Sequence, residues 1–268
     1  MRVGSIRRGS VVACLFLASS LPAAQITEAP ATPIASLSLD QVVQNLEGHN
    51  TSRATALEQF EGDRVYRLRY RGFPGDRDAE MVVKVSFHAP NSKEFSIVSQ
   101  SGSKFIIDHV FKKLIEGEQE ALRDSRQQTA LTRVNYDFQL AGYENSRNGG
   151  AYVLNLIPKT KNKYLYRGKI WVDATDFAVV RIEAEPAKNP SMWIKKTEIS
   201  HTYSKLGDFW LPVENRTVSR LRLGGVATLT IEYQNYKITK AVRVARTSSH
   251  VGDLSLLDGR LAAVSPAP

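Results

Sequence analysis

Residues 163–185 read KYLYRGKIWVDATDFAVVRIEAE. Two runs rich in β-branched and aromatic residues flank a short polar turn, which is the local pattern of a β-hairpin. If Ile170 lies opposite Val180, a three-residue loop at 174–176 joins the two strands, and this is an allowed hairpin loop length. The stretch therefore predicts two antiparallel strands in a defined register.

In that register the two faces of the hairpin differ in chemistry. One face carries Trp171 and charged side chains, with Arg167 opposite Glu183. Asp173 and Asp176 are expected to hold the turn rather than to act as a catalytic pair, because Asp favours turn positions. An antiparallel sheet that packs on one side and meets water on the other has this alternation. The predicted inward face holds Tyr166, Gly168, Ile170, Val172, Ala178, Val180, Ile182 and Ala184.

The segments on both sides of the hairpin repeat this alternation of apolar and polar residues, which predicts further strands. The alternation slips at Gln234-Asn235, which indicates a β-bulge. About ten strands follow from the pattern. Outside the hairpin they are expected at 66–70, 81–88, 94–100, 133–140, 152–156, 192–203, 209–221 and 226–238.

Two segments have helical spacing instead. Ser38 and Gln41 form a capping-box pattern that predicts a helix ending near Gly48 or slightly beyond it. Residues 103–123 form an amphipathic helix, with Phe105, Ile106, Val110, Phe111, Leu114 and Ile115 on its apolar side. Its water-facing side is expected to carry Glu116, Glu118 and Glu120. The predicted fold class is therefore α+β and mainly antiparallel β: a single curved sheet whose concave face is covered by helices.

The N-terminal residues 1–24 have the features of a secretory signal peptide. Three arginines precede the apolar run Val11–Leu21, and small residues follow it. The apolar run is too short to span a bilayer. A proline-containing linker at 25–37 then leads to a domain at 38–241. The tail at 242–268 has no strong pattern and is expected to be flexible.

The single cysteine, Cys14, lies within the apolar run of the predicted signal peptide. An exported mature chain would then contain no disulfide and depend on packing for its stability. This combination predicts export to a bacterial periplasm rather than a disulfide-stapled secreted domain.

The formal net charge is +9. A basic surface can favour anionic headgroups, but it can equally be a solvated face. The same two interpretations apply to the stripe Arg67, Arg69 and Arg71, which suits phosphate groups but is more often a solvated strand face.

The order of these elements resembles the outer-membrane lipoprotein-sorting proteins, the superfamily of the periplasmic lipoprotein carrier and its outer-membrane receptor. The resemblance is carried by Gly168–Asp173 with Val179–Glu183, then by Gly207–Pro212 and by Thr228–Tyr233. It covers roughly residues 37–240 and is a pattern of hydrophobicity and turns. It implies a half-open antiparallel β-barrel with helices as a lid, and a cavity that holds acyl chains.

An acyl-chain site needs an apolar surface with polar groups at its rim, and no ionisable catalyst. The same apolar faces could instead pack against the helices as an ordinary core, because periodicity cannot separate the two. The candidate lid residues are Phe105, Ile106, Val110, Phe111 and Leu114. The candidate lining residues are Tyr66, Leu68, Tyr70, Val83, Val85, Phe87, Tyr136, Phe138, Ile170, Val180 and Ile182.

Other chemistries lack their sequence signatures. No nucleophile elbow, Gly-rich phosphate loop or nucleic-acid motif occurs. The histidines are dispersed without ligand spacing, so neither a metal nor another cofactor is expected; His201 shares a face with Ile199 and Tyr203 and is expected to be packed. Asn50 and Asn215 begin glycosylation patterns, which are chance matches in a bacterial protein.

Three functions remain open at this point. The first is a periplasmic, non-enzymatic carrier that binds lipid or lipoprotein acyl chains. The second is a regulatory module on the same fold that senses envelope components or binds a protein partner. An enzyme such as a hydrolase, with a site that no motif reveals, is the least favoured.

Overall fold

A computed structural model describes residues 37–90, 92–124, 130–146, 149–162, 164–189 and 191–242. The predicted signal peptide, the linker up to residue 36 and the tail from residue 243 lie outside these described residues. Among the helices that the structure describes, none is both long and apolar enough to cross a membrane.

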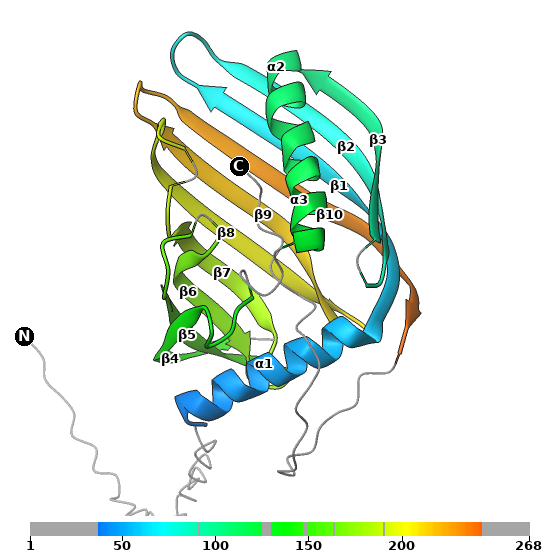
Figure 1. Cartoon of the computed structure of the whole chain (residues 1–268), viewed down its shortest axis with the longest axis vertical. Coiled ribbons are helices and arrows are strands. Elements are labelled where there is room, and N and C mark those ends of the chain that lie inside the picture. Colours follow the sequence, from blue (N-terminus) through cyan, green and yellow to red (C-terminus); the bar gives the residue numbers. More distant parts are fainter. Residues whose placement is uncertain are drawn as a thin grey trace, which may run out of the picture. The chain divides into compact units, whose positions relative to one another are not determined.

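Ten strands in the described part of the chain form one antiparallel sheet (Figure 1). Its order is β3-β2-β1-β10-β9-β8-β7-β6-β5-β4, so β3 and β4 are its two edges and the sheet is open. This confirms the predicted antiparallel sheet and its strand census. The strands are β1 Leu57–Arg71, β2 Arg77–His88, β3 Ser92–Gly102, β4 Tyr136–Ser146, β5 Gly149–Pro158, β6 Tyr166–Asp173, β7 Val179–Pro186, β8 Ile194–Leu206, β9 Phe209–Leu221 and β10 Val226–Ala241.

The first and last strands of the chain are neighbours within the sheet, where β1 pairs with β10. The predicted bulge lies in this pair. The register shifts between Glu61 and Asp63, and Asn235 adopts a φ of 54°. The Asn235 side chain donates to the carboxylate of Asp63 at 2.8 Å. Asn tolerates this left-handed conformation better than most residues, which explains its place at the bulge.

Helix α1, Leu39–Ala56, begins with the predicted capping box. The Ser38 hydroxyl accepts from the Gln41 N–H at 3.3 Å, and the Gln41 side chain accepts from the Ser38 N–H at 2.9 Å. The predicted end near Gly48 is wrong, because the helix runs on to Ala56. Arg53 in this extension is buried and binds the β6–β7 loop, which gives the last turns a tertiary partner.

The second helical segment links the two edges of the sheet, running from β3 towards β4. It consists of α2, Lys104–Ile106, a π-helical turn at Ile107–Phe111 and α3, Lys112–Asp124. This confirms the helix predicted at 103–123. A π-helical turn inside a helix is rare and often marks a functional position.

The hairpin at 163–185 forms as β6 and β7, but its register differs from the prediction by two residues. Ile170 pairs with Ile182, and the loop spans 174–178. The loop is longer because Asp173 accepts from two backbone N–H groups of the turn and because Arg53 donates to the carbonyl oxygen of Asp176 at 2.7 Å. A shift of two residues keeps the side chains from Arg181 onward on their predicted face, whereas a bulge opposite Trp171 and Val172 changes the pairing of Val179 and Val180. Arg167 therefore lies opposite Glu185 rather than Glu183.

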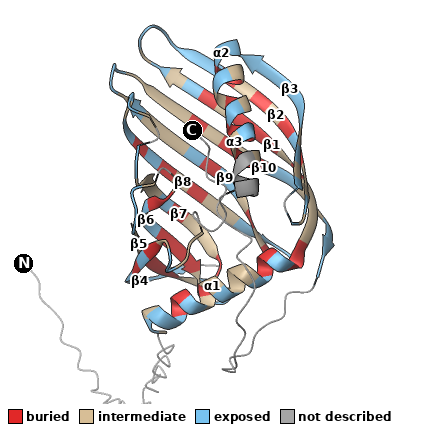
Figure 2. Ribbon diagram, viewed as in Figure 1, coloured by how far each residue is buried: buried red, intermediate tan, exposed pale blue. Residues whose placement is uncertain are grey.

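The buried residues lie in the helices and along most strands of the sheet (Figure 2). They form two large apolar clusters and a smaller one around Leu57 and Phe209. Both large clusters combine helix and strand residues, so the helices pack on the same face of the sheet that the clusters occupy.

Candidate functional site

One row of directly paired residues crosses the whole sheet on the face against which the helices pack. Its two central members, Asn215 and His201, are polar and buried, and the row is apolar on both sides of them apart from Gln100 at the edge. In strand order the row reads Gln100, Met81, Tyr66, Ile231, Asn215, His201, Ile182, Ile170, Leu154 and Leu140.

The apolar cluster on the β1 side lies under the second helical segment. Tyr66, Leu68, Val83 and Val85 of the predicted lining set belong to it. They pack with Ile106, Phe111 and Leu114 of the predicted lid, and the rings of Tyr66 and Phe111 lie 5.8 Å apart.

The apolar cluster on the β6 side lies against α1. Tyr136, Phe138, Ile170 and Ile182 of the predicted lining set pack there with Val42, Val43 and Leu46 of the helix. The structure therefore divides the predicted lining residues between two clusters instead of uniting them on one surface.

Five predicted residues lie at the margins of these clusters. Tyr70 and Val110 are partly buried against the β1-side cluster. Phe87 stacks on Phe60, with ring centroids 5.2 Å apart. Val180 is half-buried and outside the clusters, because the bulge between Trp171 and Val172 puts Val179 opposite Val172. Phe105 is exposed, which is a correction to its predicted place on the apolar side of the helix.

The strip between the two clusters has unmet hydrogen-bonding capacity. The Nε2 atom of His201 and the Nδ2 atom of Asn215 are buried without a hydrogen-bond partner. Asn215 does accept a bond from the Thr217 hydroxyl at 3.3 Å through its other side-chain atom. A buried polar atom left without a partner costs about 1–3 kcal/mol. We call His201 and Asn215 the polar seam.

Burial determines the charge state of His201, the titratable member of the seam. It lowers the pKa of His201 to about 4, because an imidazolium ion would lose its hydration there. His201 is therefore neutral at neutral pH. The ring lies 6.0 Å from that of Tyr166 in a T-shaped arrangement. A neutral imidazole beside an amide can donate to, or accept from, an uncharged polar group such as an ester or a hydroxyl.

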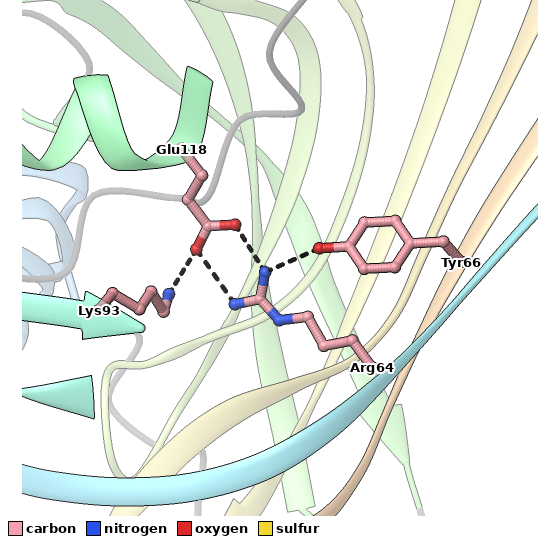
Figure 3. A network of polar contacts seen from close by, with 4 residues as sticks. All are labelled: Arg64, Tyr66, Lys93 and Glu118. Atoms are coloured by element: carbon pink, nitrogen blue, oxygen red, sulfur yellow. Dashed lines mark hydrogen bonds and ion pairs between the residues drawn. The ribbon is translucent and has the colours of Figure 1, made fainter. Parts of the chain in front are cut away.

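A buried ionic network connects α3 to the sheet (Figure 3). Arg64 of β1 donates to Glu118 in a bidentate pair, at 2.6 and 3.1 Å, and also to the Tyr66 hydroxyl at 3.3 Å. Lys93 of β3 donates to the same carboxylate at 2.5 Å. The guanidinium also lies 4.9 Å from the ring centroid of Tyr233. The helix is thus fixed to two strands at one position.

The prediction that Glu118 lies on the wet side of its helix is wrong, although Glu116 beside it is exposed. Burial alone would raise the pKa of Glu118, but Arg64 and Lys93 outweigh it and lower the pKa to about 2. Glu118 is therefore ionised at neutral pH, with both cations facing its carboxylate.

On the other face of β1, two members of the arginine stripe are engaged by carboxylates. Arg67 pairs with Glu80 and Glu232, and Arg71 pairs with Asp78 at 2.8 Å. Exposed ion pairs of this kind are expected on a solvated strand face. The described ranges contain no group of three or more His, Cys, Asp or Glu side chains that could hold a metal ion.

A search of protein-family profiles finds no match, and a search of curated protein sequences finds none either. Solved structures similar to this chain include a DUF1329 family protein from Desulfovibrio piger, at 12% identity and a TM-score of 0.36, over 74% of this chain and 93% of that one. They also include an outer membrane lipoprotein-sorting protein domain from Vibrio parahaemolyticus, at 10% identity and a TM-score of 0.37, over 76% and 94% of the two chains.

A third similar structure is the complex of MucA and MucB from Pseudomonas aeruginosa, at 10% identity and a TM-score of 0.25, over 71% of this chain and 93% of that one. Because all three TM-scores lie below 0.5, the function has to be inferred from this chain's own residues.

These residues differ in how far local sequence pattern predicts them. Alternation in β8 placed His201 on the packed face, which its burial confirms. Asn215 stood out only as the start of a glycosylation pattern, and its side chain is buried. Arg64 and Glu118 are 54 residues apart, and no local pattern links them.

Proposed function

We propose that this protein is a non-enzymatic carrier of the bacterial periplasm that binds the acyl chains of a lipid or a lipoprotein. The chains would bind on the face of the sheet against which the helices pack, called the inner face below. The observation that carries the proposal is the polar seam between two apolar clusters. Such a face matches an amphiphile, whose polar head would bind at His201 and Asn215 while its chains contact the apolar side chains on either side. Each methylene buried in this way contributes about 0.8 kcal/mol.

In this account the second helical segment is the movable lid. Its apolar residues Ile106, Phe111 and Leu114 would separate from Tyr66 and Val83 to admit acyl chains. The Arg64–Glu118–Lys93 network would act as the fixed end, about which the whole segment pivots away from the sheet.

A second candidate is a protein-binding regulatory module on the same fold. The observation that favours it is the edge strand β3, on which Ile97 and Val98 are exposed. An unpaired strand edge can accept an extended peptide as an additional strand. In that case Val98→Lys would abolish binding of the partner and leave lipid content unchanged.

The carrier proposal predicts that the seam is required for ligand retention. His201→Leu and Asn215→Leu are each expected to weaken lipid retention by about 2- to 10-fold, since each removes one hydrogen bond to the head. Stability should be unchanged or higher, because a buried unpaired polar atom is lost. Lipid that remains bound to the purified protein is measured by extraction and mass spectrometry.

Thr197→Val is the matched control. Thr197 is buried on the same face, but its hydroxyl already bonds to that of Ser219 at 3.1 Å. We expect normal lipid retention in this variant. Equal lipid retention in all three variants and the wild type would rule out a head-binding role for the seam.

A further inference from the structure

Three loops lie side by side at one end of the sheet. A Cβ atom placed on Gly72 of the β1–β2 loop would lie 2.5 Å from the Cα of Gly225 in the β9–β10 loop. The β7–β8 loop joins them, because Arg222 donates to the carbonyl oxygens of Trp193 and Met192 at 2.9 and 2.8 Å. In Figure 1 the β1–β2 and β9–β10 loops lie at the end of the sheet away from α1.

Each of these loops exposes large apolar side chains. Phe73 is 81% exposed, Met192 78%, Leu223 76% and Trp193 58%. A single exposed apolar residue is normal on a protein surface, but several on adjacent loops form a patch that marks an interaction site. We call Phe73, Met192, Trp193 and Leu223 the apolar tips.

The segments that carry the apolar tips are strongly basic. Residues 69–78, 187–196 and 218–226 contain eight Lys or Arg residues against two Asp residues, a formal balance of +6. Arg71 is engaged by Asp78, whereas Arg69, Lys195 and Arg220 are exposed within the strands that lead to the tips. Exposed cationic side chains therefore lie on the same chain segments as the apolar tips.

We propose that the apolar tips form a docking surface for a membrane that contains anionic phospholipids. Trp and Phe side chains favour the membrane–water interface, and Lys and Arg beside them attract anionic headgroups. A second copy of this chain is a poorer occupant, because two surfaces of this charge repel each other. This docking is independent of what the inner face of the sheet binds.

Trp193 reports docking directly. The other two tryptophans are buried or half-buried, and Trp210 donates its indole N–H to Asp176. Trp193 fluorescence should shift to the blue on addition of vesicles of phosphatidylcholine mixed with phosphatidylglycerol, and brominated acyl chains should quench it. Vesicles of phosphatidylcholine alone should bind about tenfold more weakly, and added salt should weaken binding to the anionic vesicles.

Variants locate the docking surface. Phe73→Ser and Leu223→Ser should each weaken co-sedimentation with the anionic vesicles by about tenfold, since each removes a large apolar side chain from the contact. Lys195→Gln with Arg220→Gln should reduce both the binding and its salt dependence. Val134→Ser alters an equally exposed apolar residue in the turn before β4 and should bind normally.

Absence of vesicle binding by the intact wild type would overturn this proposal. So would equal loss of binding in Val134→Ser. Sedimentation equilibrium supplies a further check: dimerisation of the wild type that Phe73→Ser abolishes would assign the apolar tips to self-association instead.

Discussion

Glu118 is a buried carboxylate that depends on two cations for its charge compensation. Arg64 and Lys93 contact it directly, and the Tyr66 hydroxyl accepts from Arg64. Removing one member of a buried ionic group leaves its partners uncompensated, which typically costs about 3–5 kcal/mol. We therefore expect Glu118→Gln to lower the free energy of unfolding by about this amount, measured by urea denaturation at neutral pH. Glu116→Gln, on the exposed side of the same helix, should change it by less than about 0.5 kcal/mol.

The pH dependence of this difference follows from the lowered pKa. A carboxylate whose pKa is lower in the folded state than in the unfolded state contributes stability above the unfolded pKa and loses it as the pH falls. For Glu118 the loss runs from about 4.5, its ordinary value, to about 2. The difference in the free energy of unfolding between wild type and Glu118→Gln should therefore decrease as the pH falls through that range. A difference that stays constant down to the lower limit would contradict the assigned role of the ion pair.

At the residue scale, the sequence predicted the face of a side chain better than its partners. Alternation correctly placed Tyr66, Ile170, Ile182 and His201 on the packed face. Glu118 was misassigned because two flanking glutamates suggested a solvated stripe. Burial of its carboxylate depends on Arg64 and Lys93, which lie on strands that only the tertiary fold brings beneath the helix.

At the element scale, the pairing of β6 with β7 depends on a close approach at Gly168. A Cβ atom there would lie 2.2 Å from the carbonyl oxygen of Glu183 and 2.5 Å from the Cα of Ala184. Gly168→Ala should therefore lower the free energy of unfolding by about 1–3 kcal/mol, the usual cost of overpacking. Thermal or urea denaturation measures this change.

Gly48→Ala is the matched control for that substitution. Gly48 lies in α1 with nothing within 4 Å of the added atom, and it is exposed. Replacing glycine by alanine within a helix should stabilise the protein by about 0.5–1 kcal/mol. If the two alanine substitutions change the free energy of unfolding in opposite directions, the steric effect at Gly168 is separated from any general effect of losing a glycine. Stabilisation by both would contradict the close approach.

Most elements could be predicted from local pattern, including the capping box of α1, the helix at 103–123 and the bulge at Asn235. Their limits were harder to predict when a tertiary contact decided them. The end of α1 and the length of the β6–β7 loop both depend on Arg53, whose partners in that loop are more than 120 residues away. A local sequence pattern cannot predict a contact between residues so far apart in the chain.

At the scale of the whole molecule, two features remain separate in position and role. The inner face of the sheet holds two apolar clusters divided by the polar seam, and the loops at one end hold the apolar tips. The sequence predicted the apolar residues of the inner face but not their division, because the row through Asn215 and His201 appears only when nine strand pairings are combined. The same pairings bring the apolar tips together.

The central claim is that the inner face of the sheet binds an amphiphile. Native mass spectrometry of the full chain, expressed with its own N-terminus in a bacterial envelope and purified without detergent, tests it most directly. The carrier account predicts a mass increment equal to that of a phospholipid or other acylated molecule, identified after extraction. A clean mass of the protein alone, together with no uptake of a fluorescent fatty acid, would contradict it.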